Sequence, residues 1–565
     1  MFTKRGKSHS NLKRLATIAA LAAGSLMWLW TALADTADAQ RVEERLPDDK
    51  QPVDQTPNAP KLSPAQADQD ASLSIPEFEL RFTRIEGVTA IDKKDADACA
   101  VALVGKAVGA ADLVQLTDCI TDLYRARGFF LSRAIVPKQE VKDGNLNVRV
   151  VEGYIAAIAP EGMGESDAIS QFAGTLGERP VHLATFERDL LLLSDRYGYR
   201  ITSSQLLADP QDLARYTFRV KVTVVPVSWR IYADNRGNGS SGSDQVYGSV
   251  AWNSLATSGD KLATSLFTSP SETKDLFYAD IGYALPWLDG ALWTEAGASV
   301  SRTRDPAPLL IDTTQSESER YFFRATSPLV RSRAQSLWAT LLFEGRESSQ
   351  FSADEMMSDE RLRVLRGSLS YTLVEGATRG DIAIEVSHGL DALGASVNGD
   401  PMLTRSDGRP HFTKVRLDAA FAHKFSEHWS MSAYLSGQHA DGGLVSVEEF
   451  GAGGSRYGRA YDYSEITGDD GVAAAMELRY TLANIADWLK SLQFYAFADG
   501  AMIWNRSSDP SALSQADLSS AGLGIRLTPI AGVTVSFELA QPLSRDIADK
   551  GDRGLRPFVT LQLGW

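Results

Sequence analysis

The chain has 565 residues, too many for one ordinary compact core, so its length predicts a protein of several units. Its net charge of −15 opposes nucleic-acid polyanions and argues against a nucleic-acid partner. Hydrophobic residues make up 44% of the chain and are accompanied by 45 glycines, a composition that suits strands and turns better than a bundle of apolar helices.

Residues 1–39 have the pattern of a secretory signal peptide. Basic residues from Lys4 to Arg14 precede an apolar run at residues 15–33, and small-residue cleavage sites follow at residues 32–34 and 37–39. The alternative is a membrane-anchoring helix, but the placement of the small residues favours cleavage. We therefore expect the mature protein to be exported across the inner membrane.

Residues 40–72 are rich in Pro, Asp, Gln and Ala and contain almost no aromatic or β-branched residues. Such a segment buries too little apolar surface to offset the entropy of ordering it, so it is predicted to be a linker or mobile arm. A role as a plug is implied only by its resemblance to transporters whose N-terminal segment occupies their pore. The prolines leave room for a short helix only near residues 41–46 or 63–71.

A small α/β unit is predicted next, in the order strand, helix, helix, strand, strand. These elements are expected at residues 79–85, 93–104, 113–127, 132–137 and 145–151. The only two cysteines, Cys99 and Cys119, fall on the two helices. An even cysteine pair in an exported chain indicates a disulfide rather than a metal or catalytic site. A second unit follows, with a helix at 183–197 and strands at 199–206 and 216–225.

After residue 226, segments of about ten residues alternate apolar and polar positions between turn-rich loops, the pattern of an outer-membrane β-barrel. Val415 and Leu417 would face lipid, while Arg416 and Asp418 would face a wet lumen. Sixteen strands are expected, an even number as single-chain bacterial barrels require. They lie near residues 228–235, 244–254, 260–269, 275–285, 290–301, 319–328, 333–346, 361–374, 379–389, 412–423, 428–438, 470–482, 490–503, 516–528, 532–541 and 556–565. The final strand ends on Trp565, which resembles the terminal signal read by the barrel-assembly machinery of Gram-negative bacteria.

The segment at residues 127–155 resembles the first POTRA domain of two-partner secretion transporters, the TpsB family. The residues that carry this likeness are Pro137, Gln139, Gly144, Glu152 and Gly153. Their types indicate structural roles, since Gly144 suits a hairpin turn and Glu152-Gly153 suits a strand end. The resemblance implies POTRA domains at residues 73–160 and 161–226, followed by a transmembrane barrel of about sixteen antiparallel strands at residues 227–565.

Between residues 440 and 470, a glycine-rich stretch resembles the long-loop motif of these transporters and of their BamA-like relatives. Its motif positions are Gly453, Gly454, Gly458, Arg459, Tyr461, Gly468 and Asp469. The family tetrad usually reads Val-Arg-Gly-Phe/Tyr, whereas this chain has Gly-Arg-Ala-Tyr from residue 458 to residue 461. The backbone of the loop tip is therefore expected to depart from the family more than its charge does.

On the second strand after this loop, near residues 490–503, Phe497, Asp499 and Gly500 resemble the family's F-x-D-x-G motif. The resemblance implies that Arg459 folds back into the barrel and pairs with Asp499 as a lumenal clasp, because a guanidinium matches a carboxylate bidentately. Arg456 is a rival partner for this aspartate. Residues 234–237, Asp-Asn-Arg-Gly, form another family-like fragment at the first barrel strand.

The sequence contains no G-x-S-x-G elbow, H-E-x-x-H, Walker loop or C-x-x-C motif, and its seven histidines are scattered. We therefore expect no enzyme, no cofactor and no metal site. The expected function is an outer-membrane pore whose periplasmic POTRA domains recognise an unfolded exoprotein, of the adhesin or haemolysin class, and secrete it to the cell surface. Outer-membrane lipids and the barrel-assembly machinery are further expected partners. The alternatives are a BamA-like insertase and a passive solute porin, and the POTRA units argue against the porin.

Overall fold

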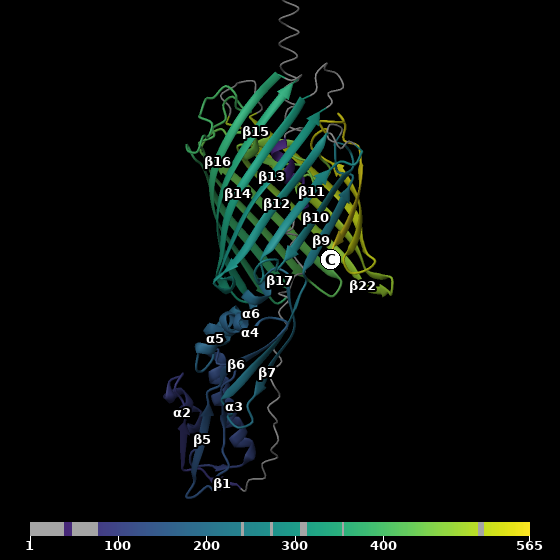
Figure 1. Cartoon of the computed structure of the whole chain (residues 1–565). Coiled ribbons are helices and arrows are strands. Elements are labelled where there is room, and N and C mark those ends of the chain that lie inside the picture. The colour runs from purple at the N-terminus through teal and green to yellow at the C-terminus, as the bar shows by residue number, and fades with distance from the viewer. Residues whose placement is uncertain are drawn as a thin grey trace, which may run out of the picture.

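The computed structural model describes residues 39–47, 77–238, 242–271, 275–305, 314–352, 355–506 and 514–564. Nearly all of the expected signal peptide, most of the arm and the terminal Trp565 lie outside these residues. Two small α/β modules sit beneath one rim of a β-barrel (Figure 1). No helix among the described residues has the length and apolarity needed to cross a membrane.

The first module packs two helices on a three-stranded sheet in the order β2-β5-β4. Its main elements are β2 (Phe82–Glu86), α2 (Lys93–Val101), α3 (Ala110–Ala126), β4 (Arg133–Ile135) and β5 (Asn145–Val151), with β1 (Phe78–Glu79) and β3 (Ala107–Val108) paired beside them. Alternate residues of β5, from Leu146 to Val150, are buried in the same core as Ile120 and Tyr124 of α3. This burial follows the predicted alternation of the strand.

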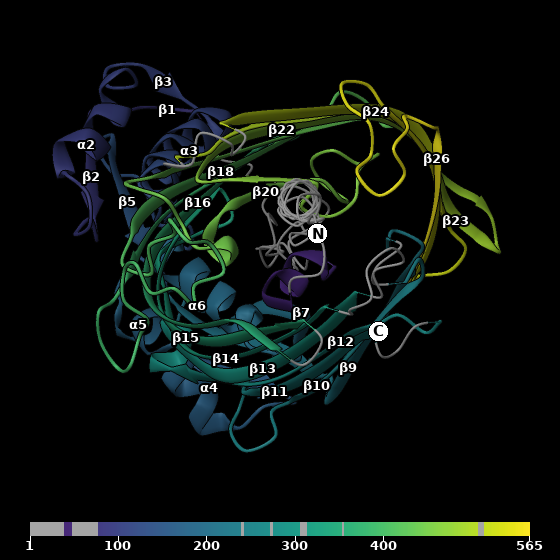
Figure 2. The same cartoon turned by 90° about the horizontal axis from the view of Figure 1, so that it is seen from above.

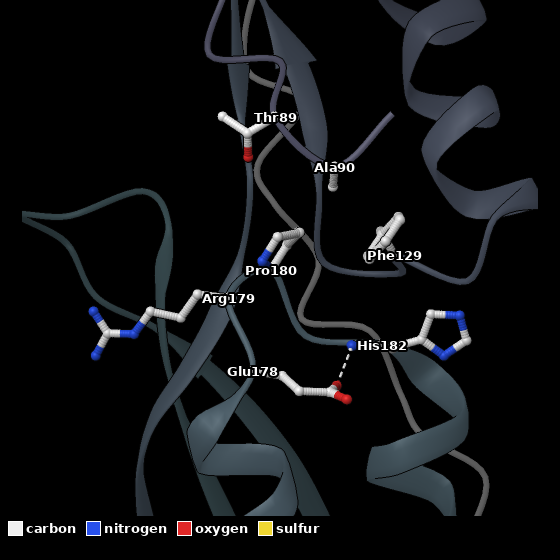
Figure 3. A pocket seen from close by; sticks show the side chains of 7 residues that line it. All are labelled: Thr89, Ala90, Phe129, Glu178, Arg179, Pro180 and His182. Atoms are coloured by element: carbon white, nitrogen blue, oxygen red, sulfur yellow. Dashed lines mark hydrogen bonds between the residues drawn. The ribbon is translucent and has the colours of Figure 1, made fainter. Parts of the chain in front are cut away.

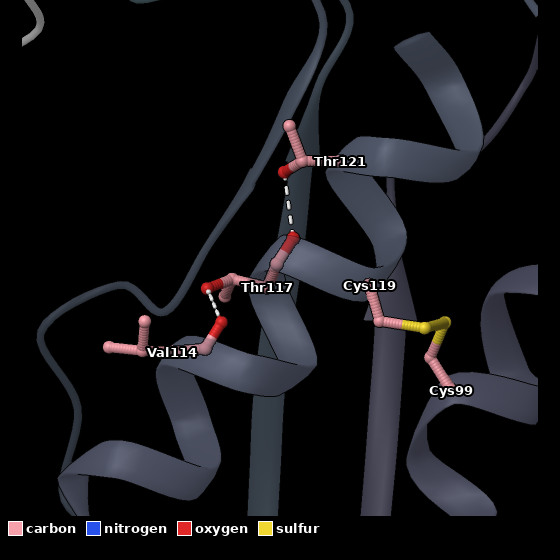
Figure 4. Close-up of a disulfide and its surroundings, with 5 residues drawn as sticks. All are labelled: Cys99, Val114, Thr117, Cys119 and Thr121. Carbon is pink, nitrogen blue, oxygen red and sulfur yellow. Dashed lines mark hydrogen bonds between the residues drawn. A yellow bond between two sulfur atoms is a disulfide. The ribbon is translucent and has the colours of Figure 1, made fainter. Parts of the chain in front are cut away.

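A disulfide joins Cys99 of α2 to Cys119 of α3, with Cα atoms 6.1 Å apart (Figure 4). The predicted cysteine pairing is therefore present, and it fixes the two helices to each other across a 20-residue sequence separation.

The second module has the same three-stranded sheet arrangement, in the order β6-β8-β7, covered by three helices. Its elements are β6 (Tyr154–Glu161), α4 (Glu165–Gln171), α5 (Ala173–Gly177), α6 (Leu183–Asp195), β7 (Tyr199–Ala208) and β8 (Arg215–Val224). Because β6 pairs with β8 from Tyr154 onward, the domain boundary expected at residue 160 falls inside a strand of the second module. The structure places the division after β5, near Gly153, since strand pairing decides which sheet a segment joins.

The remaining chain forms a closed barrel of sixteen strands, as predicted. These strands are β9 (Val227–Asp234), β10 (Gln245–Asn253), β11 (Lys261–Thr268), β12 (Leu276–Trp287), β13 (Leu292–Asp305), β14 (Thr314–Arg331), β15 (Gln335–Ser352), β16 (Glu355–Glu375), β17 (Thr378–Gly389), β18 (Thr413–Lys424), β19 (Trp429–Ala440), β22 (Asp470–Ala486), β23 (Leu489–Trp504), β24 (Gln515–Thr528), β25 (Val533–Pro542) and β26 (Arg556–Gly564). Strands β14 to β16 are longer than predicted. The prediction ended too early because the far ends of these strands carry polar residues on both faces, such as Ser316 and Glu317, and so show no amphipathic alternation.

The two faces of the barrel wall follow the predicted alternation on β18. Val415 and Leu417 are exposed on the outer face, and the inward side chains of Arg416 and Asp418 pair at 3.0 Å. A charged inner face opposite an apolar outer face is the arrangement that lipid outside and water inside require.

Helix α6 docks the second module onto the near rim of the barrel. Arg331 at the end of β14 holds Asp195 through two hydrogen bonds of 2.7 Å, and Arg333 pairs with Glu187 at 2.9 Å. Tyr197 meets Trp293 of β13 edge to face, with ring centroids 5.0 Å apart. The interface between the second module and the barrel therefore combines ion pairs with an aromatic contact. An interface of this polarity can orient the module and still allow it to move relative to the barrel.

Candidate functional site

The inside of the barrel is partly filled by the lumenal loop, which we define as residues 441–469 between β19 and β22 (Figure 2). The loop contains a short antiparallel pair, β20 (Phe450–Ala452) and β21 (Ile466–Gly468). Its buried Tyr457, Ala460 and Tyr461 belong to one apolar cluster with Phe497 of β23 and Leu518 of β24. The loop is therefore packed against the barrel wall as part of the folded core.

Three of the predicted loop glycines are required by geometry at the turn of the loop. Gly453, Gly454 and Gly458 have φ values of +120°, +90° and +81°, which side-chain-bearing residues rarely adopt. A Cβ added to Gly458 would lie 2.5 Å from Leu518 Cδ1, so this position also needs the space. Gly458 stands where the family tetrad has Val, and its φ of +81° is one that a valine would rarely adopt.

Arg459 points into the barrel wall, and Glu477 of β22 is its nearest carboxylate. The Arg459 Nη1 to Glu477 Oε2 distance is 2.7 Å, whereas Arg459 Nε lies 3.8 Å from Asp499 Oδ2. Arg459 also lies over the Phe497 ring at 4.3 Å and 3.5 Å from Glu538 of β25. The guanidinium thus sits among three carboxylates and an aromatic face, an environment that a planar delocalised cation matches well.

Asp499 binds mainly the backbone of the loop tip. Its carboxylate accepts hydrogen bonds from the Gly458 amide at 2.8 Å and the Arg459 amide at 3.3 Å, and from the Ser520 hydroxyl. The expected two-residue clasp is therefore one contact within a wider cluster. Glu477 and Glu538 were not among the partners predicted for Arg459. Each is an acid at an inward position of a strand whose outward positions are mostly apolar, and this alternation is the sequence signal that could have found them.

Arg456 was the rival partner for Asp499. Its guanidinium lies instead over the Tyr434 ring, 5.8 Å from the ring centroid. Tyr461 shares hydrogen bonds of 3.2 Å with the backbone of Arg545. Gly468 has Ile503 and Trp504 against it, so a Cβ there would meet Ile503 Cβ at 2.9 Å. On β23, Gly500 lies opposite Ala474 of β22.

Asp469 anchors the returning end of the lumenal loop. Its fully buried carboxylate accepts two hydrogen bonds from Arg405, at 2.7 and 3.1 Å, and one each from the amides of Leu444 and Arg506. Arg405 belongs to the segment between β17 and β18 and also holds Glu449 at 2.6 Å. This motif position therefore ties the lumenal loop to another loop at the rim far from the α/β modules.

A short helix from the N-terminal part of the chain also lies inside the barrel. This helix is η1 (Ala39–Arg45), drawn in purple within the ring of strands in Figure 2. Its Glu43 accepts a hydrogen bond from Ser299 at 3.0 Å and pairs with Arg346 at 3.0 Å and Arg320 at 3.6 Å. Val42 is fully buried against a cluster that includes Phe267. The short helix predicted near residues 41–46 is thus present, and the lumen holds it by charge and by packing.

Helix η1 contacts the lumenal loop as well as the wall. Arg41 donates to the backbone oxygen of Ser446 at 2.7 Å, and the Ser464 hydroxyl donates to Glu44 at 2.7 Å. A Cβ on Gly451 would lie 2.2 Å from Arg41 Nη2, so this glycine admits the arginine. Movement of η1 and movement of the loop are therefore physically linked.

The motif residues of the first module shape its fold. Glu152 accepts hydrogen bonds from the amides of Thr89 and Ala90, from the Thr89 hydroxyl, and from the Tyr124 hydroxyl at 2.6 Å. Burial raises the pKa of Glu152, but these hydrogen bonds outweigh it and leave the pKa below its ordinary value. Burial, together with the same hydrogen bond to Glu152, raises the pKa of Tyr124. Glu152 therefore ties α3 to the loop after β2.

The remaining motif residues fix turns and the junction between the modules. Gln139, whose side chain donates to the Pro137 carbonyl, exchanges two hydrogen bonds with the Asn147 backbone, at 2.7 and 2.8 Å. Gly144 has a φ of +73°, and a Cβ on Gly153 would lie 2.6 Å from the Leu131 oxygen. A hollow of about 460 Å³ lies at this junction, lined by Thr89, Ala90, Phe129, Glu178, Arg179, Pro180 and His182 (Figure 3).

A closed sixteen-stranded barrel with α/β modules on one rim and a loop and helix inside its lumen is the architecture of an outer-membrane translocation pore. The family model described as haemolysin secretion/activation protein ShlB/FhaC/HecB matches residues 219–527, and the ShlB-type POTRA domain matches residues 78–153. The chain belongs to the ShlB/FhaC/HecB family. It is a two-partner secretion transporter of the outer membrane.

Individual relatives agree with this assignment. The outer membrane transporter CdiB of Escherichia coli is 23% identical over 519 residues, covering 86% of this chain and 82% of CdiB. The heme/hemopexin transporter protein HuxB of Haemophilus influenzae (strain 86-028NP) is 22% identical over 475 residues, covering 80% of each chain. The solved structure of CdiB from Escherichia coli aligns with a TM-score of 0.70 at 20% identity, over 89% of this chain and 94% of that one.

A solved structure of BamA from Haemophilus ducreyi lacking POTRA domains 1–3 also shares the fold. Its TM-score is 0.51 at 13% identity, over 86% of this chain and all of that one. The similarity to BamA is thus more distant than the similarity to CdiB.

Proposed function

We propose that the POTRA modules receive an unfolded exoprotein in the periplasm, and that the barrel lumen passes it to the cell surface. At rest, η1 and the lumenal loop fill the lumen and move aside for transport. The main support for this proposal is that η1 is attached at two places. Glu43 pairs with Arg346 of the wall at 3.0 Å, and Arg41 donates a hydrogen bond to Ser446 of the lumenal loop at 2.7 Å. Ion pairs and hydrogen bonds of this kind are individually weak enough to exchange for contacts with a passing chain.

The proposed partner is a large exported protein of the adhesin or haemolysin class that carries an N-terminal secretion domain. The family description, which names haemolysin secretion, supports this class of partner. Folding of the exoprotein outside the cell is the proposed driving force. Outer-membrane lipids around the barrel and the barrel-assembly machinery during biogenesis are proposed as the other partners.

Capture is proposed to occur by strand addition at β7 of the second module. The sheet order β6-β8-β7 leaves β7 at an edge, and this strand is ten residues long. The corresponding edge strand of the first module, β4, has three residues and offers little backbone for pairing. Backbone hydrogen bonds to an extended segment would give affinity with little demand on its sequence, as an unfolded substrate requires.

Secretion of the partner protein tests the proposal directly. A strain that expresses the full chain with the exoprotein should release it into the medium, and deletion of the transporter should leave it in the periplasm. Ala208→Pro on β7 removes an amide that faces the open edge, because the next amide, of Asp209, donates to Arg215 of β8 at 2.9 Å and consecutive amides point to opposite edges. It is compared with Leu207→Pro, whose amide faces β8. The proline whose position faces the open edge should abolish secretion more strongly while the barrel remains heat-modifiable. Normal secretion by both variants would exclude capture at β7, and failure to secrete any exoprotein, with outer-membrane barrels depleted instead, would favour the insertase.

A further inference from the structure

The barrel closes where its first strand, β9, meets its last strand, β26, and this seam is short. Among the described residues, the pairing runs from Thr560 opposite Asp234 to Gly564 opposite Arg230. Strand β9 pairs with its other neighbour, β10, along its whole length from Val227 to Asp234. Residues 556–559, the part of β26 before Thr560, therefore lie beside the segment that follows β9. The described residues show no backbone pairing between these two segments.

Side chains hold the two strands together above the ladder. The Asn235 side chain donates to the Pro557 carbonyl at 3.1 Å and accepts from the Val559 amide at 2.7 Å, so it stands in for two ladder bonds. Two guanidinium groups lie over the ring of Phe558, with Arg236 4.0 Å and Arg556 5.0 Å from its centroid. Arg236 lies in the segment just after β9, and Arg556 is the first residue of β26, so one cation from each side of the seam contacts this ring.

Both of these arginines also bind the tip of the lumenal loop. Arg236 donates to the Arg459 carbonyl at 3.0 Å, and Arg556 donates to the Ala460 carbonyl at 3.1 Å. Arg556 pairs in addition with Asp462 of the loop at 2.7 Å. Two consecutive carbonyls of the loop tip therefore accept hydrogen bonds from the two opposite sides of the seam.

The surrounding charges keep the two arginines in these positions. Arg236 pairs with Glu538 of β25 at 2.5 Å, and the other oxygen of that carboxylate lies 3.5 Å from Arg459. Arg236 and Arg556 are 8% and 6% exposed, so breaking their contacts leaves buried donors to be satisfied elsewhere. The loop also contacts the segment just before β26, where the Ala548 amide donates to Glu465 at 2.7 Å.

We propose that the tip of the lumenal loop clasps the barrel seam, with Arg236 and Arg556 as the positioning residues that join the loop to β9 and β26. The seam is then held by its short ladder, by Asn235 and by the loop. Displacing the loop removes the last of these and loosens both seam strands together, so the state of the loop sets how firmly the barrel is closed. This inference goes beyond the proposed secretion function and holds whatever polypeptide is carried.

The test is hydrogen–deuterium exchange of the purified full chain in lipid nanodiscs, followed in peptides that cover residues 227–234 and 556–564. Three variants are compared with the unmodified chain: Arg236→Gln, Arg556→Gln and Gly458→Ala. The last is decisive, because Gly458 lies in the loop, outside both seam strands, and an alanine there is strained by a φ of +81° and by a Cβ 2.5 Å from Leu518 Cδ1. Each variant is first checked for heat-modifiable migration, so that only assembled barrels are measured.

We expect exchange to become about fivefold faster in both seam strands for all three variants, the factor that corresponds to the loss of one hydrogen bond. Arg324→Gln is the matched control, because Arg324 is also a lumenal arginine with a carboxylate partner, Glu295 at 2.8 Å, and a nearby ring, Phe322 at 5.3 Å. Its substitution should leave the seam peptides unchanged. A disulfide between Ala233→Cys and Leu561→Cys, which are opposite each other in the ladder, should cancel the increase caused by Gly458→Ala.

Three outcomes would overturn the proposal. The first is unchanged seam exchange in Gly458→Ala, which would show that the loop tip does not hold the strands. The second is an increase confined to the strand nearest each substituted arginine, and the third is an equal increase in the Arg324→Gln control. If one arginine variant fails to assemble, the other and Gly458→Ala still decide the question.

Discussion

The carboxylate of Glu477 lies 2.7 Å from the guanidinium of Arg459, so the side chain at the tip of the lumenal loop is held by β22. Asp499 of β23 holds the tip through backbone amides instead, at 2.8 Å from Gly458 and 3.3 Å from Arg459. The loop is thus fastened by two adjacent strands in two different ways, and the two fastenings can be separated by mutation.

Arg459→Ala and Glu477→Ala should each lower secretion, and the double variant should be scarcely worse than Glu477→Ala alone. Glu477→Ala is expected to be the more severe single change, because Glu477 also pairs with Arg479 at 2.6 Å and with Arg526 at 2.7 Å. Both changes remove the same buried contact, whose loss leaves one partner uncompensated at a cost of about 1–3 kcal/mol. Arg459→Ala and Asp499→Ala should instead show partly additive losses, because the amide contacts to Asp499 survive in Arg459→Ala. The readout is secreted exoprotein normalised to heat-modifiable barrel. Arg456→Ala, at the guanidinium over Tyr434, is the control and should secrete nearly normally.

Removing the charge of Glu43 should release η1 from the lumen wall. Glu43→Gln keeps the shape of the side chain but weakens the pairs with Arg346 and Arg320, so planar bilayers should show more frequent openings than the unmodified chain. Deletion of residues 39–47 should raise mean conductance further. Glu347→Gln on β15, whose carboxylate pairs with Arg363 at 2.7 Å, serves as a matched control. Equal conductance in the deletion and the unmodified chain would show that η1 does not obstruct the pore.

Loss of the disulfide should destabilise the first POTRA module. Cys99→Ser with Cys119→Ser removes a cross-link over a sequence separation of 20, worth about 3 kcal/mol in the chain-entropy model. The expected result is proteolytic cleavage within residues 77–153 at lower denaturant than in the unmodified chain, with the barrel unaffected. Thiol labelling of the unfolded, unreduced protein should detect no free cysteine. Two labelled thiols per chain would contradict the pairing.

The first POTRA module should lose stability in acid through Glu152. Hydrogen bonds from Thr89, Tyr124 and the Ala90 amide hold the pKa of this carboxyl below its ordinary value despite burial. A lowered folded-state pKa stabilises the fold above the unfolded-state pKa of about 4.3, and this contribution disappears as the pH falls toward and through the folded value. Glu152→Gln should therefore be less stable than the unmodified chain at pH 7, and the difference should shrink on acidification below about pH 4. Exchange of the residue 77–153 peptides measures it, with the exposed Glu140→Gln as control; a constant difference at every pH would contradict the linkage.

The joint between the second module and the barrel should respond to charge exchange. Asp195→Arg places a cation against Arg331, in place of the two hydrogen bonds of 2.7 Å, and secretion should fall. The double variant Asp195→Arg with Arg331→Asp restores opposite charges and should recover at least part of the secretion. Recovery identifies the pair as the joint that orients the module, because a general folding defect in either partner would persist in the double variant. Lack of any defect in Asp195→Arg would show that this orientation is not used.

Some features of this protein could be predicted from local sequence patterns alone. The count of sixteen barrel strands follows from alternation, since a period of two must put Val415 toward lipid and Arg416 toward water whatever the neighbouring strand is. The pairing of Cys99 with Cys119 follows from there being only two cysteines in an exported chain. The short helix inside the arm was also readable, because prolines excluded most other positions.

Other features depend on which segments meet, and no local pattern encodes that. The end of the first module could not be placed, because β6 has the same alternation whether it joins the sheet before it or the one after it. The resemblance directed Arg459 to Asp499, but closure of the barrel brings Glu477 nearer and places Arg236 and Arg556 beside the same loop tip. The alternation along each strand determines which carboxylates point into the lumen. A guanidinium in the lumen pairs with the carboxylates nearest to it in space, so only the tertiary structure decides which of them Arg459 binds.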